Sequence, residues 1–161
     1  MTEPRVGRAA FALGLAGLLP QLAAVTLILI GRRDPTDLAW IPALIGYGLA
    51  LLYGGLILSF LGGIWWGIAM RRAEGQAALA SLAVLPSLVA LVCLVAAAVN
   101  LPGPPSPWPA VALGSAVMLT LLVDRHLVAT GEAPTGWMRL RIPLSLGLGL
   151  LTIAAGVLIA I

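Results

Sequence analysis

Four stretches of this chain are each long and apolar enough to cross a lipid bilayer, and a fifth, following two arginines, ends the sequence. They cover approximately residues 7–30, 38–70, 76–99, 108–123 and 142–161. Hydrocarbon accepts only segments that satisfy their own backbone hydrogen bonds, so stretches of this kind form helices. We therefore predict an all-α, polytopic membrane protein in which residues 1–161 form one transmembrane domain, a five-helix bundle.

The composition agrees with this prediction and limits the partners. The chain is 61% hydrophobic and 9% charged, whereas about a quarter of the residues of soluble domains are charged. All nine cationic residues are arginines, and they are scattered in ones and twos instead of forming the basic stripe of a nucleic-acid-binding protein. We expect membrane lipids, and no nucleic acid, among its partners.

The arginines also predict how the chain is threaded. The amino terminus and the second and fourth loops hold seven of them, and the opposite side holds only Arg32 and Arg33. Loops rich in arginine stay in the cytoplasm, so we expect a cytoplasmic amino terminus and a periplasmic carboxyl terminus. Richness in alanine, leucine and glycine, with arginine as the only cation, is typical of a GC-rich bacterial genome. The expected location is the bacterial inner membrane.

Small residues recur along the second stretch and predict a packing seam. Residues four apart share one face of a helix, and small ones let a neighbouring backbone approach closely. This seam consists of Gly55, Ser59, Gly63 and Gly67. The first stretch offers a second seam that includes Gly14 and Gly17, and the two are possible partners. The alternative is that these glycines clear space for a ligand or a lipid.

Several segments together resemble a known family. They are YGGLILSFLGGIWWG at residues 53–67, LPS at 85–87, Asp124, and WMRLR at 137–141. The chain resembles an uncharacterised family of small bacterial membrane proteins related to mitochondrial transmembrane protein 69. The resemblance implies a multi-pass membrane protein with no assigned activity. Many relatives carry His or Arg where this chain has Trp65, so no proton or ligand role is expected at that position.

Charged residues are expected at the membrane edges, with none inside a span. Asp124 follows the fourth stretch, and Arg139 and Arg141 precede the fifth. An ion pair of Asp124 with either arginine would join these two helices at the cytoplasmic side. The alternative is that all three residues form a site for an anionic headgroup or substrate, because arginine binds such groups in a bidentate manner.

Polar side chains within the spans allow a second kind of site. A buried phenol requires a hydrogen-bond partner, such as a side chain or a carbonyl group near a proline. Structural hydrogen bonding is the simpler interpretation of the two tyrosines in the second stretch. The alternative is a polar cavity for a small neutral solute or a quinone-like ligand, lined by Gln21, Tyr53, Ser59 and Ser87.

Motifs for catalysis and metal binding are missing from the sequence. It has no HExxH, no GxSxG, no phosphate-binding loop and no paired carboxylates within a span. His126 and Cys93 each occur once, so neither predicts a metal site or a redox pair. We expect no catalytic residues, no metal, no cofactor and no enzymatic activity.

Two functions remain after these exclusions. The first is a non-catalytic bundle that acts by helix association, as an assembly or stabilising factor for other inner-membrane proteins or as a homo-oligomer. The second is a protein that binds or transports a small solute, a lipid or a quinone-like ligand, with a cavity near Tyr53 and Ser59.

Overall fold

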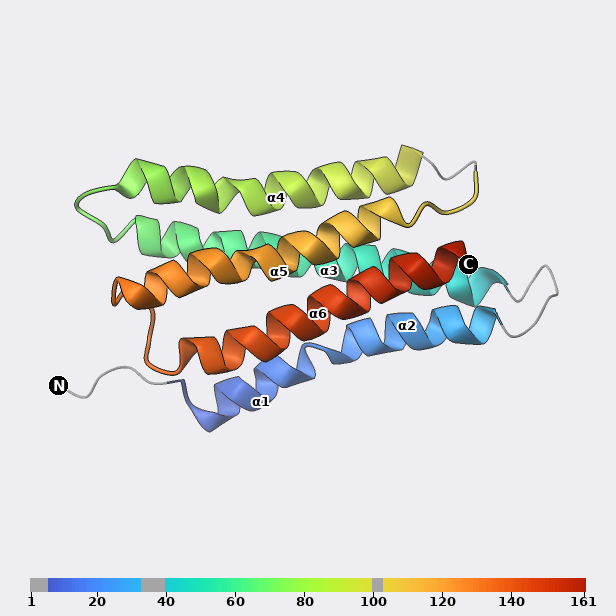
Figure 1. The fold of residues 1–161 in the computed structure, drawn as a ribbon, viewed down its shortest axis with the longest axis horizontal. Coiled ribbons are helices and arrows are strands. Elements are labelled where there is room, and N and C mark those ends of the chain that lie inside the picture. Colours follow the sequence, from blue (N-terminus) through green and yellow to red (C-terminus); the bar gives the residue numbers. More distant parts are fainter. Residues whose placement is uncertain (1–5, 33–39, 100–102) are drawn as a thin grey trace.

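A computed structural model describes residues 6–32, 40–99 and 103–161, and all the helices in this part of the chain lie in one elongated bundle (Figure 1). Within these described ranges, five segments are long and apolar enough to cross a membrane, which confirms the predicted architecture of a multi-pass helical membrane protein. The helices are α1 (Arg8–Ala16), α2 (Leu19–Gly31), α3 (Trp40–Ala69), α4 (Gln76–Val99), α5 (Trp108–Ala129) and α6 (Trp137–Ala160).

The first span is broken into α1 and α2. Pro20 stands at the start of α2, where its missing N–H and its ring prevent a regular helix from continuing through residues 16–20. The chain tightens here, and the Gly17 amide donates to the carbonyls of Leu13 and Gly14 at 3.1 and 2.9 Å. The two helices therefore form one bent segment of 24 residues, Arg8–Gly31.

The long helix α3 is the centre of the bundle. It packs against α2, α4, α5 and α6, whereas α4 packs against α3 and α5. Figure 1 shows α4 along one side of the molecule and the bent α1–α2 segment along the other. The start of α1 and the end of α6 lie at opposite ends of the bundle, as an odd number of spans requires.

Glycines set the closest approaches between helices. A Cβ atom on Gly114 of α5 would lie 2.5 Å from the Gly149 carbonyl oxygen of α6, and one on Gly149 would lie 2.8 Å from the Gly114 carbonyl oxygen. A Cβ on Gly46 of α3 would come within 2.5 Å of the Ala24 carbonyl oxygen of α2. Backbone approaches of this kind supply much of the attraction between helices in lipid, where burial of apolar surface contributes little.

The last two spans are longer than the sequence predicted. The fourth was expected to end at Val123 and the fifth to begin at Ile142, but α5 continues to Ala129 and α6 begins at Trp137. The charged residues that suggested early helix ends lie within regular helix instead. The predicted start of the second span at Leu38, like Arg5 and Arg33, lies outside the described residues.

Candidate functional site

A buried ion pair joins α5 to α6. The Nε atom of Arg141 donates to Oδ2 of Asp124 at 2.6 Å, and the two side chains are 6% and 1% exposed. The other carboxylate oxygen accepts a hydrogen bond of 3.0 Å from the indole N–H of Trp65 on α3. A second guanidinium nitrogen of Arg141 donates to the Thr120 hydroxyl at 3.1 Å. Three helices thus meet at one carboxylate.

Of the two arginines considered for Asp124, Arg141 is the partner and Arg139 is not. Two residues along a helix correspond to a rotation of about 200°, so the side chains of residues 139 and 141 leave α6 in nearly opposite directions. The sequence placed Asp124 and Arg141 just outside the predicted spans, whereas the structure places both within helices long enough to cross a membrane. Asp124 is five residues from the end of α5, and Arg141 is four residues from the start of α6. Each stays buried because its charge is compensated by the other.

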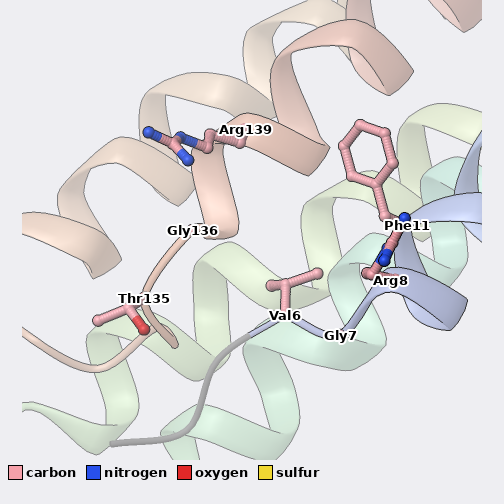
Figure 2. A pocket seen from close by; sticks show the side chains of 7 residues that line it. All are labelled: Val6, Gly7, Arg8, Phe11, Thr135, Gly136 and Arg139. Atoms are coloured by element: carbon pink, nitrogen blue, oxygen red, sulfur yellow. The ribbon is translucent and has the colours of Figure 1, made fainter.

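Arg139 lies at a different place, an open hollow where the start of α1 meets the start of α6 (Figure 2). The hollow has a volume of about 650 Å³, and Arg8 and Phe11 of α1 also line it. In Figure 2 the guanidinium group of Arg139 points away from Arg8. Binding of an anionic headgroup by Arg139 stays a prediction, but Asp124 and Arg141 are not part of the same hollow.

A second buried polar contact ties α2 to α3 and α6. Gln21 is fully buried, and its Nε2 atom donates to the Thr152 hydroxyl at 2.7 Å and to the Ala50 carbonyl at 3.3 Å. The Thr152 hydroxyl in turn donates to the Leu148 carbonyl at 2.7 Å. The amide of Gln21 is therefore a link between helices.

The polar cavity expected from Gln21, Tyr53, Ser59 and Ser87 does not form as predicted. Ser87 is exposed on α4, and neither Gln21 nor Ser59 lines a cavity with Tyr53. Tyr53 does line a different cavity of about 220 Å³, together with Arg141 and Ser145 of α6. Its hydroxyl donates to the Gly17 carbonyl at 2.5 Å, which confirms the expected bond to a carbonyl near a proline.

The glycine seam of α3 is also corrected by the structure. Gly55 faces α4, where a Cβ would lie 3.4 Å from Cδ1 of Leu94, but Gly63 and Gly67 face outward with nothing within 4 Å. Each step of four residues overshoots a full turn by about 40°, so the series rotates by about 120° between residues 55 and 67. Ser59 is only partly buried.

The contact with α4 follows a spacing of seven residues instead. Gly55, Gly62 and Ala69 are all buried, and a Cβ on Gly62 would overlap the Ala83 carbonyl oxygen. Seven residues deviate from two full turns by only about 20°, so this series stays on one face. The ring of Pro86, inside α4, lies against the same glycine.

The glycines of the first span do not pack against α3 as a seam. A Cβ on Gly14 would lie 2.8 Å from Cδ1 of Leu140 on α6, so this glycine lies at the contact of α1 with α6. Gly17 stands at the break between α1 and α2, beside the hydroxyl of Tyr53. It is the α2 part of the span that packs along α3.

Residues 6–157 match the family described as "Protein of unknown function (DUF3429)". The chain belongs to this family. The search of curated proteins and the search of solved structures each found no match. Trp65, Asp124 and Arg141 of this DUF3429 protein come from three of the segments on which the sequence resemblance rests, and the fold brings them into one cluster.

One more ion pair of this DUF3429 protein joins the loops at the end of the bundle where α3 and α5 finish. Nε of Arg72 donates to Oε2 of Glu132 at 2.6 Å, and the second guanidinium contact is 2.5 Å long. These hydrogen bonds, together with one from the Thr130 hydroxyl, hold the pKa of Glu132 below its ordinary value of 4.5. The sequence did not single out this pair, because its members are sixty residues apart and carry no motif.

Proposed function

We propose that the protein is a non-catalytic, multi-pass inner-membrane protein that acts by helix association. The observation that carries this proposal is the outward position of Gly63 and Gly67 on α3. Two glycines four residues apart form the GxxxG spacing that lets a second transmembrane helix approach closely. Among the described residues no helix covers either glycine, since a Cβ on either would meet nothing within 4 Å.

Large apolar side chains flank these glycines. Leu56 and Phe60, which precede them on the same face, are 69% and 63% exposed, and Trp66 is 46% exposed. A groove of small residues between large ones is the surface into which a partner helix fits by van der Waals contact. We refer to the face made by Leu56, Phe60, Gly63 and Gly67 as the α3 outer face.

The interior of the bundle supports the same proposal. Asp124 is bonded to Arg141 and Trp65, and Gln21 is bonded to Thr152. Polar groups that are bonded to one another across helices fix the positions of those helices. A fixed bundle suits a protein whose outer surface receives a partner, such as an assembly or stabilising factor.

The partner that we propose first is a second copy of this chain. A face on a single helix can pack against the same face of a second copy about a two-fold axis, without any further component. Donor-labelled and acceptor-labelled protein, mixed in liposomes over a range of protein-to-lipid ratios, should show energy transfer. Replacing Gly63 and Gly67 together by leucine should weaken association at least tenfold.

Gly48→Leu is the matched control, because Gly48 lies on the same helix and a Cβ there would also meet nothing within 4 Å. It should associate like the wild type. Equal energy transfer in the wild type and the double variant would refute the proposed face. If the wild type shows no transfer at any ratio, self-association is refuted, and purification with other inner-membrane proteins becomes the test of an assembly role.

The threading and the location belong to the same proposal. Figure 1 shows the starts of α1 and α6 and the ends of α3 and α5 at one end of the bundle, and the end of α2 at the other. By the helix bounds, the first group of helix ends carries Arg8, Arg139, Arg71, Arg72 and Arg125, and among the described residues Arg32 follows the end of α2. This asymmetry supports a cytoplasmic amino terminus, a periplasmic carboxyl terminus and a bacterial inner membrane. A reporter enzyme that is active only outside the cytoplasm should be active when it is fused after Ile161. Activity of a reporter that works only in the cytoplasm would show that the membrane topology is inverted.

A further inference from the structure

The cavity beside the buried ion pair has the shape of a small binding site. It has a volume of about 220 Å³ and lies among the α1–α2 break, α3 and α6. Leu13 and Phe60, which are 75% and 63% exposed, form its outer edge. Val117 and Ser145, which are 0% and 1% exposed, line its inner end. A ligand would thus enter from the side of the bundle, where the lipid is.

The local sequence explains why there is space at this position. Gly14 and Gly17 line the cavity and contribute no side chains to it. The break before Pro20 bends the first span at the same level, and Tyr53 holds the bend through its bond to the Gly17 carbonyl. The remaining wall is mostly leucine, isoleucine and valine, so an occupant needs an apolar body.

One buried polar atom in this wall has no partner. The hydroxyl oxygen of Ser145 is buried and makes no hydrogen bond with the protein. A buried hydroxyl without a partner lowers stability, because nothing compensates for the water that it loses on burial. Ser145 lines the cavity, so a rotation of its side chain about χ1 would turn this buried hydroxyl toward a ligand that accepts a hydrogen bond.

The charge beside the cavity selects a neutral ligand. The guanidinium group of Arg141 also lines the cavity, and Asp124 compensates its charge at 2.6 Å. An anion would have to compete with a carboxylate that is already in place, whereas a carbonyl oxygen would not. The hydroxyl of Tyr53 is already committed as a donor to Gly17. The inner end thus offers the hydroxyl of Ser145 as a donor, beside a neutralised cation.

We propose that this cavity binds an uncharged, lipid-soluble molecule whose ring carries a carbonyl group, such as the headgroup of a quinone. An apolar cavity of about 150 Å³ holds a benzene ring, so this slightly larger one fits a substituted ring. The ring contacts the aliphatic wall, its carbonyl accepts from Ser145, and its tail leaves past Leu13 and Phe60 into the lipid. Phe60 also belongs to the α3 outer face, so this site is proposed for the unassociated protein, in which its outer edge faces the lipid.

The test measures binding of decylbenzoquinone to the full-length protein in lipid nanodiscs, by equilibrium partitioning and by the rise in the thermal unfolding midpoint. Decylbenzene, which has the same tail and a ring without carbonyls, is the matched ligand control. The quinone should bind about fivefold to tenfold more tightly than decylbenzene, the gain expected for one hydrogen bond. Methyl decanoate tests whether the carbonyl of a lipid ester is the natural occupant, and it should bind more weakly than the quinone.

Ser145→Ala is the decisive variant, because it removes the hydroxyl without filling the cavity. It should weaken quinone binding about fivefold to tenfold, the loss expected for one hydrogen bond, and leave decylbenzene binding unchanged. The ligand-free variant should be at least as stable as the wild type, since an unpartnered hydroxyl is removed. Ser87→Ala, at an exposed serine of α4, should change neither affinity.

Three outcomes would overturn the proposal. Equal affinity for decylbenzoquinone and decylbenzene would make the cavity a purely apolar void. Unchanged quinone affinity in Ser145→Ala would remove the hydroxyl from the site. Tighter binding of methyl decanoate would assign the cavity to lipid esters. All these measurements are made on isolated copies at low protein density. Failure of quinone binding would therefore not refute association through the α3 outer face, and failure of association would not refute quinone binding.

Discussion

Asp124 on α5 and Arg141 on α6 form a 2.6 Å ion pair that is almost completely buried between their helices. Charges are rare within transmembrane segments because each is costly in hydrocarbon unless a partner compensates it. Here the partner is the opposite charge, and Trp65 and Thr120 bond to the pair from α3 and α5. The pair therefore specifies how three helices meet.

Replacing Asp124 by asparagine should destabilise the protein strongly. The shape of the side chain is kept, but the cation of Arg141 is left buried without its anion. Breaking a buried pair in this way costs about 3–5 kcal/mol of the free energy of unfolding. Thermal and denaturant-induced unfolding in mild detergent would measure the loss.

The exposed Arg139, exchanged for glutamine, is the control and should change stability little. The double variant Asp124→Asn/Arg141→Met should lose less free energy of unfolding than the sum of the losses in the two single variants. The reason is that the second substitution removes the charge that the first leaves uncompensated. A variant D124N as stable as the wild type would contradict a structural role for the pair.

The spans could be predicted from the sequence because their length and apolar character are properties of single segments. The ends of α5 and α6 could not, because Asp124 and Arg141 look like boundary residues until each is known to face the other. Pairing between helices is a property of two segments, and no local pattern encodes it. Trp65 was missed as a partner of Asp124 for the same reason.

The sequence predicted the wrong series of glycines as the contact face of α3, and the reason is different. Glycines occur in adjacent pairs on α3, at residues 54 and 55 and again at 62 and 63, so series of four and of seven residues both fit the sequence. The choice depends on the neighbouring helix. Only the position of the Ala83 carbonyl and Pro86 on α4 selects Gly62 and leaves Gly63 outside.

These two neighbouring glycines should therefore respond in opposite ways to alanine. Gly62→Ala places a Cβ on the Ala83 carbonyl and should cost about 1–3 kcal/mol, the usual loss for overpacking. Gly63→Ala adds its methyl group to open space and should raise the stability of the monomer by about 0.5–1 kcal/mol, the usual gain when alanine replaces glycine inside a helix. Unfolding of both variants in dilute detergent would test the register, and equal losses would show that the assignment of inner and outer faces is wrong.

The Arg72–Glu132 pair predicts a loss of stability in acid. The pKa of Glu132 is lowered in the folded protein, so its carboxylate stabilises the fold fully above pH 4.5, the ordinary value. This contribution is lost as the pH falls from 4.5 through the lowered pKa. We therefore expect the thermal unfolding midpoint of the wild type, measured between about pH 7 and pH 3, to decrease once the pH drops below 4.5.

Glu132→Gln separates this pair from the other carboxylates. The variant should be less stable than the wild type at neutral pH, and the difference should shrink to nothing as Glu132 becomes protonated in the wild type. A difference that stays constant over the whole range would mean that titration of Glu132 is not coupled to folding.

Tyr53→Phe should loosen α1 and leave the rest of the bundle intact. Helix α1 has no buried residues and packs against α6, so its position depends on few contacts. One of the bonds that hold the break is the 2.5 Å bond from the Tyr53 hydroxyl to the Gly17 carbonyl. Its loss, worth about 1 kcal/mol, should speed amide hydrogen exchange several-fold within residues 8–17.

Tyr47→Phe provides the comparison closer to the start of α3, because its hydroxyl donates to the Ser106 carbonyl at 2.5 Å. Faster exchange in that variant should appear near the start of α5 and not in α1. Mass spectrometry of the exchanged peptides distinguishes the two patterns. If Tyr53→Phe instead raised exchange throughout α3, α5 and α6, the hydroxyl would be a support of the whole bundle, and α1 would not be an independently mobile part.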